Sequence, residues 1–375
     1  MQSDKTFSTK KKIAVIIWKD GTGGAERSLT DLAVALDRGQ FDMRFYYLSD
    51  RPGHFSQQIQ SLGFKTEFLN WKNGYDIKGR IRLLKSLKRY DPHLIHDHIL
   101  PPLTRPFIKI FTKLPVLYTE HGVACKRAAS PGTAWLRKLL ERFDFLFCDL
   151  IAANSHASST ALQSVYNIPN SKIEIVHLGI NLKEFHPASV VRSQLTIGYL
   201  GRILNKPKGV NRLPLIAKFL LRNKKQLDFI IKVAGDGPDR AATEQMCISM
   251  GVEKHFHFLG WVTDVRAFFS QIDVLVIPSH FEALGLVALE ALAMNVPVVA
   301  FNTGGLPEIL EECPNGSLVQ QDDVEGMAKA IISAKDVSQE TKDAGRRYIQ
   351  HFFSNNIMAK NFEKIYDQMI MGQFR

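Results

Sequence analysis

The richest group of residues suited to chemistry lies between Pro278 and Glu290. An apolar run precedes this segment and an apolar helical pattern follows Gly285, so the residues predict a strand, a glycine turn and then a helix. The backbone amides near Leu286 and Val287 would lie at the start of that helix. Because the first amides of a helix have no partner within it, they favour an anion, and Gly285 allows close approach.

Two carboxylates flank this turn. Glu282 and Glu290 are eight residues apart, which corresponds to at most about 12 Å along a helix. That spacing excludes the acid pair of a glycosidase, whose carboxyl groups lie about 5–9.5 Å apart. It suits two anchors for one long ligand, such as a sugar at one end and a ribose at the other. The alternative, a helix cap and a surface carboxylate, stays open at this point.

Basic residues follow a second predicted strand. Arg202 comes at the end of that strand, and Lys206 and Lys208 follow in the next loop. An arginine fork and a mobile lysine charge at the carboxyl end of a strand suit a diphosphate, although lone pairs of this kind are also common on solvated surfaces. The neighbouring glycines favour the functional interpretation; they are Gly201 and Gly209, with Gly235 and Gly237 in a similar turn after the next strand.

The first half carries weaker signals. A glycine cluster with Gly21, Gly23, Gly24 and Glu26 resembles a phosphate-cradling turn. It matches neither G-x-G-x-x-G nor G-x-x-x-x-G-K-[ST], so the residues support neither a dinucleotide site nor a P-loop. His121 stands just past an apolar strand and before a glycine, at the edge of a parallel sheet where ligand-binding residues occur. A lone histidine is more often structural, and that alternative stays open.

No metal site is expected. The triplet His96-Asp97-His98 resembles a set of metal ligands, but we expect the alternation of side chains along a strand to leave only one histidine facing a given site. The chain has no Asp-x-Asp motif, which would be expected where a divalent cation grips a diphosphate. Its four cysteines lack C-x-x-C spacing, which argues against a zinc site or a disulfide framework and favours a reducing compartment.

The sequence predicts two halves, each with alternating strands and helices, and these elements must position the residues named above. Short apolar strands alternate with helical patterns, which predicts parallel sheets covered by helices on both faces. A turn around His186-Pro187 marks the boundary. We therefore expect an α/β protein of two doubly wound domains with a cleft between them, covering 1–187 and 188–354, followed by an amphipathic helical segment, 355–375. The expected strands are 13–18, 43–48, 94–95, 116–119 and 150–153, then 196–200, 229–234, 256–259, 274–277 and 297–301.

Composition and charge narrow the possible classes. The 375 residues are 45% apolar and 23% charged, which excludes a disordered or fibrous protein and fits two domains. We find no secretory signal and no apolar run of membrane-spanning length. Residues 1–190 carry 27 Lys and Arg against 17 Asp and Glu, whereas the remainder carry 21 against 20. The excess positive charge of one half predicts an acidic partner or surface, with a merely soluble basic domain as the alternative.

Three stretches of the basic half, 78–89, 105–113 and 134–147, combine Lys and Arg with large apolar residues. Basic amphipathic helices suit an anionic membrane surface, although core-facing helices with basic outer faces explain much of the pattern. We expect a cytoplasmic protein that is peripheral on the inner face of the cytoplasmic membrane, with no nucleic-acid partner.

Together these residues resemble the retaining glycosyltransferases of the GT-B fold, specifically glycosyltransferase family 4. The resemblance spans almost the whole chain; each matching segment is modest alone, but their order and spacing are highly specific. Five residues separate Arg202 from Lys208, where four is frequent, so Lys206 competes for the phosphate role. The matching segments are 23–26, His121-Gly122, Gly201-Arg202 with Lys208-Gly209, 235–238, 258–260, the E-x7-E element from Glu282 to Glu290, 297–300 and 303–308.

The resemblance implies roles for individual residues. Arg202 and Lys208 would bind the donor diphosphate and stabilise the leaving group without a metal ion. Glu282 would hold hydroxyls of the donor sugar, Glu290 the ribose, and His121 would lie near the anomeric carbon and the sugar's 6-position. No protein nucleophile is expected, because retention in this family is thought to proceed by same-face attack. The remaining donor-binding residues would be Gly24, Gly235, Gly237, Gly285, Leu286 and Val287.

The resemblance therefore predicts a retaining, metal-independent glycosyltransferase that needs no cofactor. It would move a hexose from a nucleotide sugar, expected to be a UDP-sugar, to a lipid-linked or cell-surface glycan in lipopolysaccharide, capsule or similar polysaccharide biosynthesis. The acceptor would bind the basic N-terminal domain, onto which the C-terminal helix would cross back. Two alternatives are an inactive GT-B subunit that scaffolds another transferase and a GT-B nucleotide-sugar epimerase.

Overall fold

The computed structural model describes residues 10–18, 23–98, 100–124, 135–187, 194–223 and 227–373. Contacts divide the chain into two units: Met1–Gly179 with Asn355–Arg375, called unit 1 here, and Ile180–Ser354, called unit 2. The turn at His186, taken from the sequence as the boundary, lies within unit 2. The segment that leads into this turn is bonded to the rest of unit 2. The Ile180 amide donates to the Phe353 carbonyl, and the Arg346 guanidinium donates to the Leu182 carbonyl.

Unit 1 is built on a parallel sheet of seven strands in the order β3-β2-β1-β4-β5-β6-β7. Four residues of the inner strand β1, Ile13 to Ile16, are fully buried, as expected for a parallel strand with helices on both faces. The strands are β1 (Lys11–Ile17), β2 (Phe41–Tyr47), β3 (Lys65–Phe68), β4 (Leu94–His98), β5 (Val116–Glu120), β6 (Leu150–Ala153) and β7 (Ile173–Ile175); the helices are α1 (Gly24–Ala35), α2 (His54–Ser61), α3 (Ile77–Tyr90), α4 (Thr104–Thr112), α6 (Trp135–Phe145) and α7 (His156–Tyr166).

Unit 2 repeats the design with six parallel strands in the order β10-β9-β8-β11-β12-β13. The predicted α/β class with two doubly wound sheets is thus confirmed. The strands are β8 (Leu195–Leu200), β9 (Phe229–Ala234), β10 (Phe256–Gly260), β11 (Val274–Ile277), β12 (Val298–Phe301) and β13 (Gly316–Val319); the helices are α8 (Leu213–Asn223), α9 (Arg240–Met250), α10 (Val265–Phe269), α11 (Leu286–Ala293), α12 (Leu306–Leu310), α13 (Val324–Lys335) and α14 (Gln339–Phe352). No helix in the described ranges is long and apolar enough to cross a membrane.

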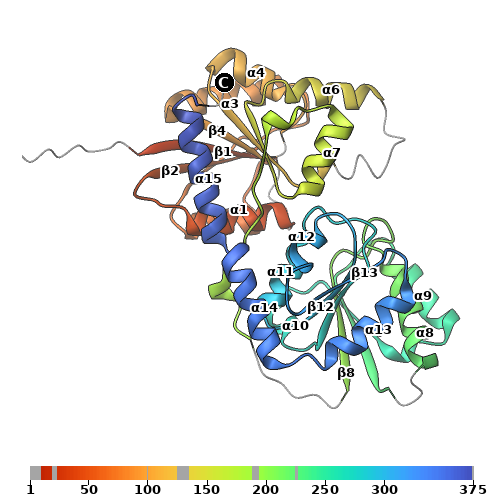
Figure 1. Ribbon diagram of the computed structural model, residues 1–375. Coiled ribbons are helices and arrows are strands. Elements are labelled where there is room, and N and C mark those ends of the chain that lie inside the picture. Colours follow the sequence, from red (N-terminus) through yellow and green to blue (C-terminus); the bar gives the residue numbers. More distant parts are fainter. Residues whose placement is uncertain are drawn as a thin grey trace, which may run out of the picture. The chain divides into compact units, whose positions relative to one another are not determined.

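The last helix, α15 (Asn355–Ile370), belongs to unit 1, where Figure 1 draws it in blue beside α1 and the sheet. Its Tyr366 hydroxyl lies 2.7 Å from Nδ1 of the fully buried His96. The Lys11 ammonium pairs with Asp367 at 2.6 Å, and the Tyr366 ring meets Phe41 edge to face. The end of the chain is therefore part of the unit 1 core.

Both sheets reverse their winding once, between β1 and β4 in unit 1 and between β8 and β11 in unit 2. At such a switch point, the loops after the two strands turn to opposite faces of the sheet, and ligands bind at the carboxyl ends of the strands. In unit 2 these loops are 201–209 and 278–285. They carry most of the residues singled out from the sequence.

The loop after β12 supports this edge through backbone contact. Gly304 has φ +58°, and a Cβ at this position would overlap the carbonyl oxygen of Glu282. The neighbouring Gly305 amide donates to that same carbonyl at 3.0 Å. The position of Glu282 therefore depends on a glycine at 304.

This contact generates a test with a matched control. Gly251 has a similar φ of +68° but open space around it, so Gly251→Ala should cost only the left-handed strain of about 1–2 kcal/mol. Gly304→Ala should cost a further 1–3 kcal/mol or so, because an overlap with backbone cannot be relieved by a side-chain rotation. Urea unfolding of the two variants measures the difference. Equal losses would mean that the loop after β12 does not hold Glu282.

Candidate functional site

The loop after β8 is packed directly against the loop after β11. Gly209 has φ +66°, and a Cβ there would overlap the Pro278 carbonyl oxygen. The His280 amide donates to the Pro207 carbonyl at 2.8 Å, which adds a second backbone link between the loops. Lys208, between these two contacts, is therefore held against the β11 loop.

This packing brings two sequence-predicted residues into direct contact. The Lys208 ammonium lies 2.7 Å from Oε1 and 3.0 Å from Oε2 of Glu282. The Ser279 hydroxyl donates to the same Oε1 at 2.8 Å. The Glu282 side chain is 11% exposed and that of Lys208 30%. A buried carboxylate without a partner would be costly, so each charge neutralises the other.

The residues around the pair fix the rest of the β8 loop. The buried Tyr199 hydroxyl donates to the Arg202 carbonyl at 2.9 Å. Burial and the nearby negative charge of Glu282 raise the pKa of Tyr199, so it stays a neutral donor. The side chains of Arg202 and Lys206 are exposed, unlike Lys208, which is the basic residue of this loop that engages Glu282.

Helix α11 begins where the sequence places it. Gly285, at φ +106°, precedes Leu286 as the N-cap residue. Leu286 and Val287 are partly exposed in the first turn, whereas Glu290 is only 6% exposed. Because Glu290 is buried, the structure excludes the alternative in which it is a carboxylate on the protein surface. The first turn of α11 presents backbone amides at the same sheet edge as Lys208, an arrangement that favours an anion.

Gly235 and Gly237 lie beneath the β8 loop. A Cβ at Gly235 would overlap the Gly201 carbonyl oxygen, and one at Gly237 would overlap that of Ile203. The Ile203 amide also donates to the Asp236 carbonyl at 2.9 Å. Both glycines thus support the loop that carries Arg202 and Lys208.

Arg212 is a site residue that the sequence did not reveal. Its guanidinium donates to the Pro278 carbonyl at 2.8 Å, contacts Nδ1 of His280 at 2.9 Å and pairs with Asp322. Burial, together with the positive charges of Arg212 and Lys206, lowers the pKa of His280. Arg212 therefore fixes the β11 loop through its contacts with Pro278 and His280. No motif marks it, because its partners are 66 to 110 residues away in sequence.

Of the glycine cluster in unit 1, Gly21 lies outside the described residues. Gly23 is the N-cap of α1 and Gly24 its first residue. The Glu26 carboxylate accepts a hydrogen bond from the Gly23 amide at 3.2 Å. Glu26 therefore acts as a capping residue, and the Gly24 amide lies in the first turn of α1.

His121 is partly exposed and stands at the end of a row of imidazoles whose other two members, His96 and His98, are buried. Its Nε2 shares a hydrogen bond with Nδ1 of His98 at 2.9 Å, and the rings of His98 and His96 are 4.2 Å apart. The expectation that only one of the two strand histidines faces a given site was wrong, because residues two apart on a strand lie on the same face. Nε2 of His96 also contacts the Thr119 hydroxyl at 2.7 Å.

Burial keeps these histidines neutral. It lowers the pKa of His121 to about 4 and that of His96 to about 3, and it lowers the pKa of His98 as well. Within the described part of the chain, no three His, Cys, Asp or Glu side chains are grouped to hold a metal ion.

Comparisons with known proteins agree with this architecture. The family model "Glycosyltransferase Family 4" matches residues 22–184, and "Glycosyl transferases group 1" matches residues 194–336. An uncharacterized glycosyltransferase of Methanocaldococcus jannaschii is 33% identical over 285 residues, covering 70% of this chain and 71% of that protein. An Escherichia coli UDP-Gal:alpha-D-GlcNAc-diphosphoundecaprenol alpha-1,3-galactosyltransferase is 24% identical, with coverages of 88% and 90%.

A solved structure shares the fold over nearly the full length. The crystal structure of Anabaena HepE in complex with UDP and glucose superposes with a TM-score of 0.78 at 18% identity, covering 96% of this chain and 100% of that one. With two parallel-sheet units, a family 4 domain in the first and a group 1 domain in the second, the chain belongs to the GT-B glycosyltransferases.

Proposed function

We propose that the protein is a retaining, metal-independent glycosyltransferase that moves a hexose from a UDP-sugar to a lipid-linked or cell-surface glycan. The pathway would be lipopolysaccharide, capsule or similar polysaccharide biosynthesis. The observation that carries the proposal is the Lys208–Glu282 pair at the switch point of unit 2. Support for the substrate classes comes from the names of the Escherichia coli relative, with its UDP-Gal donor and diphosphoundecaprenol acceptor, and of the UDP complex of HepE.

The pair suggests how a donor would be bound. A diphosphate would draw the Lys208 ammonium away from Glu282, while Ser279 keeps its hydrogen bond to the carboxylate. Glu282 would then accept hydroxyls of the donor sugar. Lys208, Arg202 and the first amides of α11 would stabilise the negative charge that grows on the departing nucleoside diphosphate. These groups would supply the charge that a divalent cation supplies in other enzymes.

The first test is a calorimetric titration of the full chain with UDP, GDP and ADP, in EDTA and again with magnesium. One nucleotide should bind equally well in both buffers. Lys208→Ala should weaken its affinity about 10- to 100-fold, the equivalent of one lost charge-assisted contact. The exposed neighbour Lys206→Ala is the control and should bind like the unmodified protein.

Either of two results would contradict this assignment. Affinity lost in Lys206→Ala but kept in Lys208→Ala would move the phosphate role to Lys206. Failure of all three nucleotides to bind would leave the inactive scaffold as the better account.

Glu282→Gln separates sugar binding from nucleotide binding. Removing the negative charge releases Lys208 from its ion pair, so affinity for the nucleoside diphosphate should stay the same or rise. Transfer should fall at least about 100-fold, because the donor sugar loses a charged acceptor of hydrogen bonds. Steady-state transfer and calorimetry measure the two effects, with the exposed Glu253→Gln as control. A parallel fall in binding and turnover would show that Glu282 holds another part of the donor.

Product analysis distinguishes the remaining alternative and tests retention. An α-linked donor should give an α-linked glycan by NMR. An epimerised nucleotide sugar, or free nucleotide without a glycan product, would favour the epimerase.

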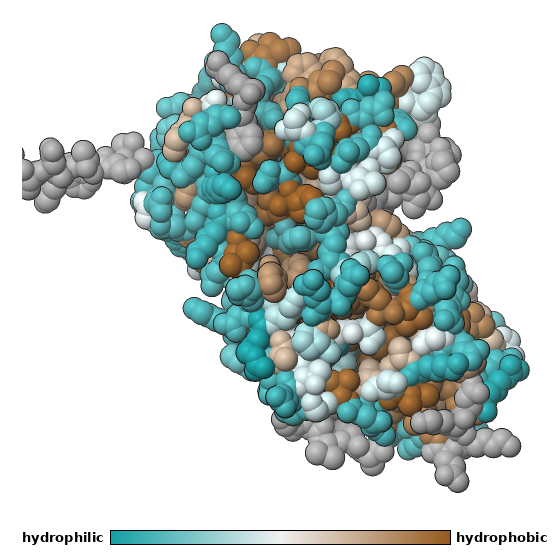
Figure 2. Space-filling view, viewed as in Figure 1, coloured by the Kyte–Doolittle hydropathy of each residue, from teal (hydrophilic) through white to brown (hydrophobic). Residues whose placement is uncertain are grey.

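We also propose that unit 1 docks on an anionic membrane surface through α4 and α6. Large apolar side chains on these neighbouring helices are exposed, and Figure 2 shows brown side chains at the top of the view, where Figure 1 places α4. Exposed cations nearby are Lys113, Lys138 and Arg142. Such a surface combines apolar insertion with attraction to anionic lipid. The apolar residues are Ile110 and Phe111 on α4, Trp135, Leu139 and Phe143 on α6, and Leu146 directly after α6.

Helix α3, which holds the most basic stretch of the sequence, is less suited to this role. Arg80 is buried and donates to the Gly74 and Pro102 carbonyls. Arg82 donates to the Leu69 carbonyl, and Arg89 pairs with Glu67. Half of its six basic side chains thus serve the fold of unit 1.

Vesicle co-sedimentation tests the membrane proposal. The protein should bind vesicles that contain phosphatidylglycerol and not vesicles of phosphatidylcholine alone. The double substitution Phe111→Ser and Trp135→Ser should reduce binding about tenfold or more, because it removes exposed apolar area. Trp261→Ser, an exposed tryptophan of unit 2, is the control. Equal binding of both variants would exclude α4 and α6 as the docking surface.

A further inference from the structure

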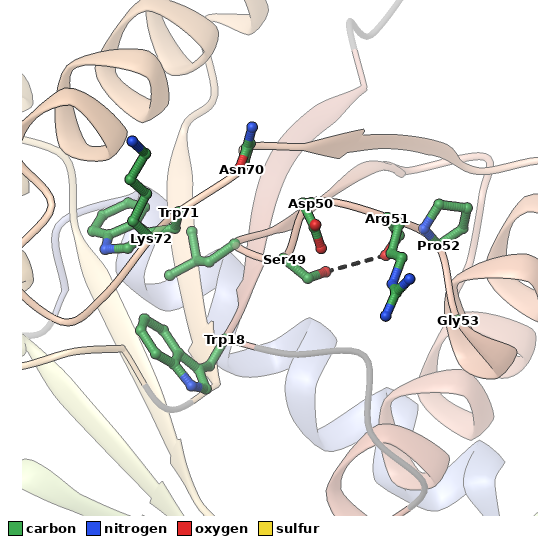
Figure 3. A pocket seen from close by; sticks show the side chains of 10 residues that line it. Trp18, Ser49, Asp50, Arg51, Pro52, Gly53, Asn70, Trp71 and Lys72 are labelled. Atoms are coloured by element: carbon green, nitrogen blue, oxygen red, sulfur yellow. Dashed lines mark hydrogen bonds between the residues drawn. The ribbon is translucent and has the colours of Figure 1, made fainter.

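Two features lie at the carboxyl edge of the unit 1 sheet, on opposite sides of its switch point. A pocket of about 680 Å³ lies at the ends of β1, β2 and β3. Figure 3 shows that the Lys72 ammonium points away from Arg51, so the cations of the lining do not converge on one ligand. At the ends of β4 and β5, in contrast, His98 and His121 point at each other. This histidine contact carries the inference.

Each imidazole of the pair carries one proton. Burial lowers the pKa of His98, and it lowers that of His121 to about 4, so neither ring is a cation at neutral pH. A neutral imidazole has one N–H donor and one bare nitrogen that accepts. Because Nδ1 of His98 lies 2.9 Å from Nε2 of His121, one of these atoms carries a proton and the other accepts it. This choice fixes the tautomer of both rings.

The other nitrogen of His98 distinguishes the two arrangements. Nε2 of His98 is buried and has no hydrogen-bond partner among the described residues. If His121 were the donor, the proton of His98 would lie on that nitrogen, as a buried N–H without an acceptor. If His98 donates from Nδ1, the same nitrogen is a bare acceptor. Buried N–H groups without an acceptor are the rarer of the two defects in folded proteins, so the geometry favours His98 as the donor.

The tautomer of His121 follows from this assignment. With Nε2 accepting from His98, the proton of His121 lies on Nδ1. His121 is partly exposed, and within the described ranges its one hydrogen bond is the contact with His98. Its Nδ1–H is therefore a donor that remains for an oxygen of a ligand.

A third histidine keeps His98 in place. The ring of His96 lies 4.2 Å from the ring of His98. Nδ1 of His96 contacts the Tyr366 hydroxyl at 2.7 Å, and its Nε2 contacts the Thr119 hydroxyl at 2.7 Å. With both nitrogens bound, His96 is a fixed surface against which His98 packs.

The turn that carries His121 is fixed as well. Glu120, the last residue of β5, is fully buried. Its carboxylate accepts from the Tyr118 hydroxyl at 3.0 Å and from the Ala124 amide at 3.1 Å, across the turn. His121 is thus held through the backbone by Glu120 and through its ring by His98.

We propose that His98 is a positioning residue that holds His121 as its Nδ1–H tautomer, so that His121 presents a donor to an oxygen of the transferred sugar. The ligand in this statement rests on the proposed transferase function, whereas the tautomer rests on the geometry of unit 1 alone. An Nδ1–H of His121 would donate to a hydroxyl or phosphate oxygen. A bare Nδ1 would instead place its lone pair against the lone pairs of a phosphate oxygen.

Nitrogen NMR of the full chain labelled with ¹⁵N-histidine measures the tautomers without any substrate. The chain has 12 histidines, and a single substitution assigns each ring of the pair. Protonated and bare ring nitrogens give well-separated resonances. His121 should be protonated at Nδ1 and bare at Nε2, and His98 should be protonated at Nδ1. In His98→Leu, the ring of His121 should populate both tautomers.

Two substitutions at His98 separate hydrogen bonding from packing. His98→Leu fills the space without a donor and should lower the turnover of transfer about tenfold. Affinity for the nucleoside diphosphate should not change, because the proposed donor contacts lie in unit 2. His98→Asn keeps a side-chain N–H near the position of Nδ1 and should recover most of the loss. The control is His255→Leu, which removes an imidazole contact with the Phe229 carbonyl in unit 2 and should keep its turnover.

Two results would overturn the proposal. A proton on Nε2 of His121 in the unmodified chain would make His98 the acceptor and leave no Nδ1–H for a ligand, whether or not the variants fold. Equal loss of turnover in His98→Asn and His98→Leu would show that His98 acts through packing alone. A chain that binds no nucleotide but shows the expected tautomers would contradict the proposed function and support the geometry inferred for His98.

Discussion

Backbone-to-backbone packing at the carboxyl edge of the unit 2 sheet is the constraint on which the candidate donor site depends. Gly209 allows the β8 loop to touch the Pro278 carbonyl, and Gly304 allows the β12 loop to touch the Glu282 carbonyl. With no side chain between them, the loops bring Lys208 within 2.7 Å of Glu282. The ion pair is thus a consequence of close loop packing at the point where the sheet reverses its winding.

An ion pair at this place has a chemical use. Lys208 and Glu282 neutralise each other in the free protein, which avoids an unpaired charge at a mostly buried position. Each is also suited to a different part of a sugar diphosphate, the cation to phosphate and the carboxylate to hydroxyls. In the mechanism we propose, exchange of the internal pair for two ligand contacts would let the site bind a polar donor with little rearrangement. Arg212 and Tyr199 donate hydrogen bonds to carbonyls of the two loops, and these bonds would keep the loop geometry if the pair opened.

Unit 1 uses the same sheet edge differently. The imidazoles of His96, His98 and His121 form a row, buried at His96 and His98 and partly exposed at His121, which contacts α15 through Tyr366. The C-terminal helix therefore stabilises the neighbourhood of His121. A separate pocket lies at the ends of β1, β2 and β3 and is lined by Trp18 and Trp71.

Local patterns in the sequence were sufficient for the fold class and for the positions of the site loops. The apolar runs of β6, β9 and β11 predict their bounds without error, whereas the short, half-polar edge strands β3, β7 and β13 give no comparable signal. The contact of Lys208 with Glu282 and the role of Arg212 depend on residues far apart in sequence, so no local pattern contains them. Trp18 and Trp71 line the same pocket because β1 and β3, the strands that precede them, lie on either side of β2 in the sheet. The prediction that His96 and His98 face different sites was wrong, because residues two apart on a strand lie on the same face.

Amide hydrogen exchange of the full chain, with and without a saturating nucleoside diphosphate, tests the central claim most directly. The account predicts slower exchange in 201–209 and 279–290, the two loops joined by Lys208 and Glu282 together with the start of α11, and unchanged exchange in 69–72 of the unit 1 pocket. Protection confined to unit 1, or binding without protection of 201–209, would contradict it.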